Sequence, residues 1–139
     1  MREETAATSL TILVALQGNE TDRQVIRMAC FLAGDRGATL RVVYPIEVPL
    51  TQPLESWNEE SEARAQQVLA QAASHAEQSG CVSRGTVMPT RGASGAILDE
   101  AVEWAANAIV LASPFRSRLG DASLEVLKRA PCSVLLWRP

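Results

Sequence analysis

The feature of this sequence that most constrains its fold is the alternation of short apolar runs with longer amphipathic stretches. A nearly continuous apolar run is typical of a strand buried on both faces of a parallel sheet. The expected strands are Leu10–Leu16, Leu40–Val48, Val82–Met88, Ala108–Ala112 and Val134–Trp137. Helices are expected between them, from Asp22 to a stop at Gly34 and Gly37, over Ser56–Ser79, from about Ser94, and over Asp121–Arg129.

Strands that alternate with helices in this way predict an α/β fold, in which a parallel sheet carries helices on both faces. In such a sheet, ligands bind beyond the carboxyl ends of the strands at the switch point. The segments there are residues 17–20, after the first strand, and residues 112–120, after the fourth. Pro45 is awkward inside the second strand because it lacks a backbone N–H, so it predicts a strand end or a bulge.

The length of 139 residues fits one domain, expected over residues 10–139 after a flexible polar tail at residues 1–9. The net charge of −3 argues against broad electrostatic binding to nucleic acid or to anionic membranes. No apolar run approaches the roughly 20 residues of a membrane span. Glu3 and Glu4 stand where a signal peptide would carry bases. The sequence therefore predicts a cytoplasmic protein that does not insert into membranes.

Few residues are available for catalysis or for metal binding. His75 is the single histidine, and we expect it on the surface of the long helix. Cys30, Cys81 and Cys132 are odd in number, far apart in the sequence and without a CxxC pair. They are predicted to be small buried hydrophobic residues in a reducing compartment. No catalytic residue and no metal site is predicted.

The loop after the fourth strand is the most suggestive stretch, because it leads to a helix start and carries Arg116 and Arg118. A helix N-terminus offers free N–H groups and a positive dipole end, which suit a phosphate. The alternative is a plain turn, in which Gly120 gives backbone freedom and Asp121 caps the helix. The Asp121 carboxylate would also repel a bound phosphate.

Common catalytic and nucleotide motifs are missing. The sequence has no Gly-x-Ser-x-Gly elbow, no Gly-x-x-x-x-Gly-Lys-Ser/Thr loop and no Gly-x-Gly-x-x-Gly after the first strand. Glu20 and Asp22 are expected to stabilise a helix N-terminus by charge rather than to act as acid and base. Trp57 and Trp104 are expected to be packing residues.

Both ends of the chain resemble universal stress protein domains. Ile12-Leu13-Val14-Ala15 followed by Gly18-Asn19-Glu20 is similar to their opening strand and loop, and residues 108–113 resemble their fourth strand. Their last helix and strand resemble Gly120-x-x-Ser123-x-x-Val126-Leu127-x-x-Ala130-Pro131-Cys132-x-Val134-Leu135. The resemblance covers Leu10 to Arg138. It implies a Rossmann-like sheet of five parallel strands in the order 3-2-1-4-5.

The resemblance also implies a nucleotide crevice, whose motif is degenerate here. ATP-binding members carry an Asp at the end of the first strand and Gly-x2-Gly-x9-Gly before a Ser or Thr. Gln17 replaces the Asp, Ala112 and Phe115 replace two glycines, residues 116–119 stand where nine are expected, and Asp121 replaces the hydroxyl residue. These side chains crowd and repel phosphates. The candidate crevice comprises Gln17, Gly18, Ala112, Ser113, Arg116, Arg118, Gly120, Asp121 and Ala122.

The last strand is an apolar edge with little charge before Arg138. Because family members usually pair through this strand, the resemblance implies a homodimer with Val134, Leu135, Leu136 and Trp137 at its interface. Such an edge is either a liability or an interface, and Trp137 would bury a large apolar area. Residues 46–49 and the long helix also resemble stress-protein domains attached to some membrane transporters, which makes a transporter a candidate partner.

Two hypotheses follow. The first is a dimeric regulatory or binding domain of the universal stress type, without catalysis of its own and without ATP or another cofactor. The second is a stress-response protein that binds ATP or AMP in the loop after the fourth strand. A phosphorylated receiver domain is excluded because the third strand ends at Met88-Pro89-Thr90, without the required Asp. A flavodoxin-like FMN carrier is excluded because residues 17–19 offer no hydroxyl-rich phosphate loop.

Overall fold

The computed structural model describes residues 10–34, 39–56 and 58–139; the expected tail at residues 1–9, Gly37 and Trp57 lie outside them. The elements in chain order are β1 (Thr11–Ala15), α2 (Thr21–Ala33), β2 (Thr39–Glu47), α3 (Glu59–Gln78), β3 (Val82–Thr90), α4 (Ala93–Glu103), β4 (Ala108–Ala112), β5 (Arg116–Ser117), β6 (Gly120–Asp121), α5 (Ala122–Arg129) and β7 (Ser133–Trp137).

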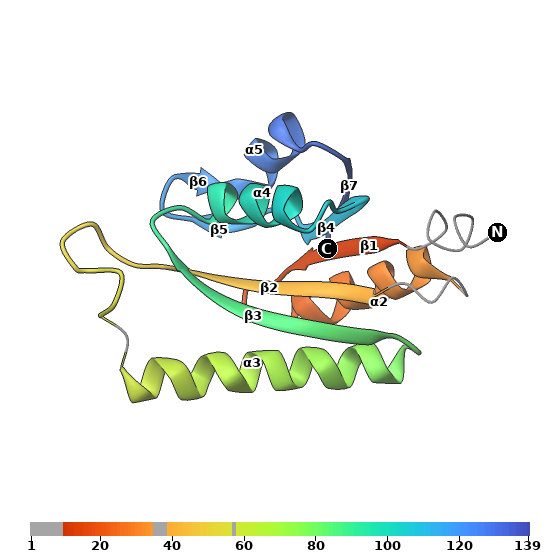
Figure 1. Ribbon diagram of the computed structural model, residues 1–139, viewed down its shortest axis with the longest axis horizontal. Helices are drawn as coiled ribbons and strands as arrows, with labels where there is room; N and C mark the ends of the chain where they lie inside the picture. Colours follow the sequence, from red (N-terminus) through yellow and green to blue (C-terminus); the bar gives the residue numbers. More distant parts are fainter. Residues whose placement is uncertain (1–9, 35–38, 57) are drawn as a thin grey trace.

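Five parallel strands form one sheet in the order β3-β2-β1-β4-β7 (Figure 1), which confirms the predicted α/β fold and strand order. The short strands β5 and β6 form a separate antiparallel hairpin between β4 and α5. The sequence did not predict this hairpin, because two-residue strands are too short to show an alternating pattern.

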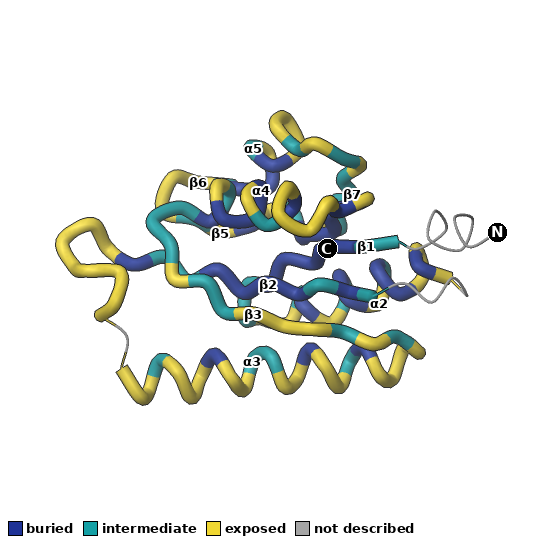
Figure 2. Tube along the Cα trace, in the orientation of Figure 1, coloured by how far each residue is buried: buried dark blue, intermediate teal, exposed yellow. Residues whose placement is uncertain are grey.

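Each face of the sheet has its own apolar core. Ile12 and Val14 of β1 pack with side chains of α2 and α3 on one face. Leu13 and Ala15 pack with side chains of α4 and α5 on the other. Because alternate residues of a strand point to opposite faces, a strand that serves both cores must be apolar throughout. Figure 2 accordingly shows β1 buried along most of its length and the edge strand β3 largely exposed.

Pro45 neither ends β2 nor makes a bulge, contrary to the sequence expectation. The strand continues to Glu47, and Pro45 stands opposite Met88 of β3 in unbroken register. Val43 directs its carbonyl toward β1, where it accepts from the Leu16 N–H at 2.9 Å. Alternate residues of a strand bond to the same side, so Pro45 also faces that side, beyond the end of β1. No ladder donor is needed there.

Helix α3 begins at Glu59 rather than at the predicted Ser56. The side chain of Asn58 caps it by accepting from the Ser61 N–H at 2.7 Å. Asp121 caps α5 as expected, because its carboxylate accepts from the Ser123 N–H at 3.0 Å. None of the helices in the described ranges is both long and apolar enough to cross a bilayer.

Three expectations about single residues need correction. Trp104 is not a packed core residue: it is 42% exposed, and the Arg41 guanidinium lies over its ring, 3.4 Å from the centroid. Cys81 and Cys132 are only half-buried. His75 lies at the surface only in part, since its Nδ1 is buried without a hydrogen-bond partner.

Candidate functional site

The β5–β6 hairpin lies at the carboxyl ends of β1, β2 and β4, where the sequence predicted a ligand crevice. Arg116 pairs with Asp121, and Ser117 pairs with Gly120. Gly120 has a φ of +110°, a conformation that glycine adopts without strain. The hairpin is fixed by two side chains that reach it from the ends of neighbouring strands, and we call Gln17 and Glu47 the hairpin clasp.

Gln17 holds the hairpin from the end of β1. Its Oε1 accepts from the Arg116 N–H at 2.8 Å, and its Nε2 donates to the Pro114 carbonyl at 3.1 Å. A side-chain amide is suited to this task because it can donate and accept at once. A carboxylate at this position could only accept, so it would leave the Pro114 carbonyl without this donor.

Glu47 holds the hairpin from the end of β2, and the sequence analysis did not identify it as a site residue. One carboxylate oxygen accepts from the Arg118 N–H at 2.6 Å. The other accepts from the Ser117 hydroxyl at 2.7 Å and from the Ala93 N–H at 2.9 Å, at the start of α4. The signal that could have found Glu47 is an acid that ends an apolar strand at the ligand-binding edge of the sheet.

The electrostatics of Glu47 favour its ionised form. Burial acts to raise the pKa of the Glu47 carboxyl. The hydrogen bonds from Ser117, Ala93 and Arg118, with the positive charge of Arg118, together outweigh burial, so the pKa lies below its usual value. Glu47 is therefore an anion that accepts three hydrogen bonds within the chain.

Asp121 plays a similar part inside the hairpin. Its Oδ1 accepts from the Phe115 N–H at 2.8 Å, from the Ser123 N–H and from the Ser123 hydroxyl at 2.7 Å. Burial acts to raise the pKa of Asp121, but the hydrogen bonds from Phe115 and Ser123 hold it below its usual value. The Phe115 ring is 2% exposed and belongs to the core on the α4 side. The turn interpretation of this loop, with Asp121 as a cap, describes the geometry correctly.

Asp22 supports the turn from which Gln17 projects. Its two carboxylate oxygens accept from the Gln17 N–H at 2.8 Å and from the Gly18 N–H at 2.9 Å. It is not the capping residue, because the helix begins after Glu20, whose side chain makes no capping bond. Burial raises the pKa of Asp22 from 3.8 to about 6, against the opposing hydrogen bonds from Gln17, Gly18 and Asn19.

Gly18 meets two requirements of this turn. Its φ is +79°, and a Cβ placed on it would lie 2.5 Å from the Tyr44 hydroxyl. The positive φ favours glycine because of the backbone conformation, and the nearby hydroxyl leaves no room for a side chain. The glycine predicted for the crevice therefore serves the packing of β2 against the turn.

The structure brings only part of the predicted crevice together. Gln17, Ala112, Ser113 and Arg116 line one cavity of about 180 Å³. This is smaller than the roughly 300–1,000 Å³ of typical ligand pockets. Arg118 is not part of its lining: the guanidinium donates to the Arg91 carbonyl at 2.6 Å. The two arginines predicted to meet an anion therefore do not line this cavity together.

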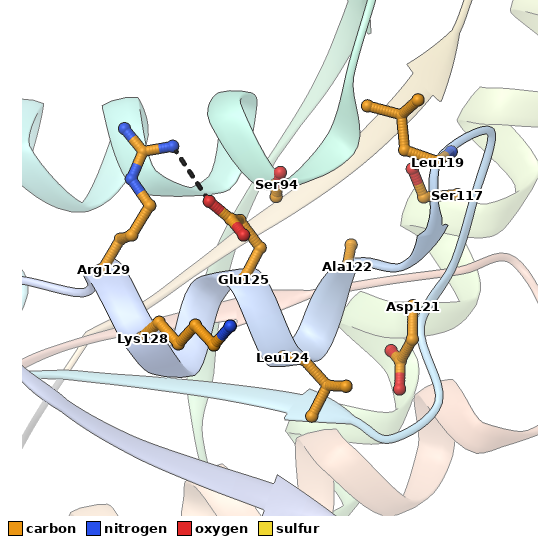
Figure 3. A pocket seen from close by; sticks show the side chains of 9 residues that line it. All are labelled: Ser94, Ser117, Leu119, Asp121, Ala122, Leu124, Glu125, Lys128 and Arg129. Carbon is orange, nitrogen blue, oxygen red and sulfur yellow. Dashed lines mark hydrogen bonds and ion pairs between the residues drawn. The ribbon is translucent and has the colours of Figure 1, made fainter.

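Asp121 and Ala122 belong instead to a second pocket, of about 370 Å³, between the hairpin, the start of α4 and the length of α5 (Figure 3). Glu125 and Arg129 on its rim form an ion pair with an N···O distance of 3.2 Å. Figure 3 shows Lys128 on the same helix, pointing away from this pair. Across the described ranges, no group of three or more metal-ligating side chains gathers.

The chain matches one protein family over nearly its whole length. Residues 9–138 match the Universal stress protein family. The universal stress protein from Archaeoglobus fulgidus, in complex with dAMP, is 23% identical with a TM-score of 0.74, and the match covers 91% of this chain and 96% of that one. A universal stress family protein from Arabidopsis thaliana with AMP bound is 13% identical with a TM-score of 0.65, over 93% and 91% of the chains.

A third structure, a universal stress protein in complex with cAMP, is 19% identical with a TM-score of 0.71, over 93% of this chain and 96% of that one. Among curated proteins, no sequence matches this chain significantly. At these identities the structures share the fold with this chain, and their ligands are properties of those proteins.

Replacing Glu47 with alanine tests the hairpin clasp. The change leaves the Ala93 and Arg118 N–H groups and the Ser117 hydroxyl without their acceptor, so we expect a loss of about 1–3 kcal/mol in the free energy of unfolding. We also expect faster amide exchange at Arg118. Urea denaturation and hydrogen exchange measure the two effects. Glu103→Ala, at the exposed end of α4, is the control, and equal stabilities for the two variants would contradict the role of Glu47.

Asp22 makes a pH-dependent contribution to stability. Because its pKa is higher in the folded chain, about 6 against 3.8, the folded state takes up the proton more readily. The resulting stabilisation is complete below the lower value and is lost as the pH rises through about 6. Relative to Asp22→Asn, the native chain should lose about 2 kcal/mol between about pH 4 and about pH 7. Urea titrations at several pH values measure this. Asp99→Asn, exposed on α4, is the control, and parallel profiles for the native chain and Asp22→Asn would disprove the effect.

Proposed function

Because the chain belongs to the universal stress protein family, we propose that it is a regulatory binding domain that has no catalytic activity of its own and binds no adenine nucleotide in its crevice. The main support for this proposal is that the backbone amides of the loop already donate hydrogen bonds to side chains of this chain. Phosphate sites in such loops are built from free backbone N–H groups. Here the amides of Phe115, Arg116 and Arg118 donate to Asp121, Gln17 and Glu47.

Charge supports the same conclusion. Hydrogen bonds hold the pKa values of Glu47 and Asp121 below their usual range, so both carboxylates are anions at neutral pH. A phosphate in contact with the hairpin would meet two negative charges, each costing on the order of 1 kcal/mol in water and about 4 near a protein surface. The Arg118 guanidinium donates to the Arg91 carbonyl, and its positive charge already stabilises the Glu47 carboxylate.

The absence of catalysis is part of the proposal. A general base has to be within hydrogen-bond reach of the proton it removes. The carboxylates of Glu47 and Asp121 are occupied by backbone and hydroxyl donors and are already stabilised as anions. They act as structural acceptors for the hairpin. A cytoplasmic location and a membrane-transporter partner accompany this proposal as expectations from the sequence.

The alternative function is binding of ATP or AMP. It is favoured by the relatives of the same fold that were solved with dAMP, cAMP or AMP. In this chain a nucleotide could contact Gln17, Ser113 and Arg116 in the cavity of about 180 Å³, or Asp121 and Ala122 in the pocket of about 370 Å³. Contact between a phosphate and the hairpin amides would require the hairpin to leave Gln17 and Glu47, at the cost of several hydrogen bonds.

Nucleotide binding is tested directly on freshly purified protein. We expect no adenine nucleotide to be released on denaturation, and no heat of binding with ATP or AMP in calorimetry at micromolar concentrations. The Archaeoglobus fulgidus protein that was solved with dAMP serves as the positive control, titrated with dAMP. Copurified adenine nucleotide, or micromolar affinity for ATP or AMP, would establish the alternative instead.

We further propose that β7 pairs with its own copy in a homodimer. The strand bonds to β4 on one side only, so its other side is an edge of the sheet. The Ser113 N–H donates to the Trp137 carbonyl at 2.8 Å, on the β4 side. By strand alternation, the N–H and C=O groups of Val134 and Leu136 then face the free edge. All four side chains from Val134 to Trp137 are only half-buried.

Replacing Leu135 with glutamate should give a monomer, because a charge beside the paired edges opposes burial. Size-exclusion chromatography with light scattering measures the mass, and circular dichroism verifies the fold. Val82→Glu, on the exposed opposite edge β3, is the control and should leave the dimer intact. Trp137→Ala, which adds no charge, is a second interface variant and should weaken the dimer. A folded Leu135→Glu variant of unchanged size would contradict the edge pairing.

A further inference from the structure

The fold brings together two cysteines that are far apart in the sequence. Cys30 lies in the last turn of α2 and is 6% exposed, and Cys81 follows α3. Both belong to the apolar core between the sheet and the helices α2 and α3. Cys81 is also near enough to the Cys30 thiol to influence the ionisation of that thiol. Cys132 belongs to the core on the opposite face of the sheet.

The position of Cys81 is fixed by the way α3 ends. The Gly80 N–H donates to the Glu77 carbonyl at 3.0 Å, and the Cys81 N–H donates to the Ala76 carbonyl at 2.8 Å. Gly80 has a φ of +84°. These two bonds and the left-handed glycine form a Schellman motif, in which the residue after the glycine packs back onto the helix. Cys81 is therefore directed into the core, toward Cys30, by the backbone of the helix end.

The two thiols differ in access to solvent. Burial first, and then the neighbouring Cys81, raise the pKa of the Cys30 thiol to about 12. Cys30 therefore stays protonated and shielded from solvent. Cys81 is half-buried and lines an open groove of about 440 Å³ between α3 and β3. A reagent from solution therefore reaches Cys81 first, and Cys30 is the second thiol, which is shielded from the reagent.

We propose that Cys30 and Cys81 form a dithiol site that a neutral hydroperoxide oxidises to an intramolecular disulfide. Glu77 also lines the groove, which disfavours anionic oxidants at Cys81. This site lies apart from the hairpin and does not depend on whether a nucleotide binds there.

The reaction balances in two steps. The Cys81 sulfur attacks one peroxide oxygen, an S–O bond forms while the O–O bond breaks, and the departing oxygen leaves as water or an alcohol with the thiol proton. The Cys30 sulfur then attacks the Cys81 sulfur. The S–S bond forms, the S–O bond breaks, and the hydroxyl leaves as water with the Cys30 proton. The peroxide is reduced by two electrons that both come from the two thiols.

The test counts thiols in the full chain after exposure to hydrogen peroxide. We expect the native chain to lose two of its three free thiols, to lose the mass of two hydrogens, and to migrate faster on a non-reducing gel. A thiol reductant should reverse all three changes. Peptide mapping should find Cys30 joined to Cys81.

The control is Cys132→Ala, which keeps the pair and should form the same disulfide. Cys30→Ala and Cys81→Ala should not form it, and Cys30→Ala should instead gain oxygen at Cys81. Three outcomes would overturn the proposal: retention of all three thiols by the native chain, a disulfide that includes Cys132, or addition of oxygen to Cys81 in the native chain without loss of Cys30.

Discussion

Strand β1 has to be apolar on both of its faces, and the rest of the molecule is organised around this requirement. Ile12 and Val14 contribute to the core beneath α2 and α3, while Leu13 and Ala15 contribute to the core beneath α4 and α5. Parallel pairing with β2 and β4 fixes the strand between two neighbours. Gln17 is the first residue after β1 that is not fully buried between the two cores. Its side chain can therefore be polar and can bond to the hairpin.

The loop after the fourth strand meets the needs of its own backbone amides. These amides meet Gln17, Glu47 and Asp121, which supply oxygen acceptors in place of a ligand. The short loop contributes to this, because the two-residue ladder brings Asp121 close to the Phe115 N–H that donates to it. On the proposed function, these side chains occupy the amides that a phosphate would otherwise need.

The hydrophobic pattern predicted the parallel sheet and most helix boundaries, because burial on two faces leaves a strong signal, and the strand order came from the resemblance to universal stress proteins. This pattern did not predict contacts between residues that are far apart in the sequence. Glu47 and Arg118 are 71 residues apart in the sequence. Cys30 and Cys81 are separated by the whole of β2 and α3. Pro45 misled for a different reason: the sequence marks the missing N–H but not which side of the strand it faces. Asp22 was expected at the helix start, but its bond to the preceding turn depends on a buried arrangement that has no local pattern.

The turn at Gly18 has a consequence for how this protein can vary. A smaller residue in place of Tyr44 would remove the collision with a Cβ at position 18, yet the backbone there would still be left-handed. Two independent obstacles at one position cannot be lifted by a single compensating change. Substitution at position 18 should therefore be rarer among relatives that keep this turn than the size of Tyr44 alone would suggest, and a tolerated replacement should be asparagine combined with a shorter side chain at position 44.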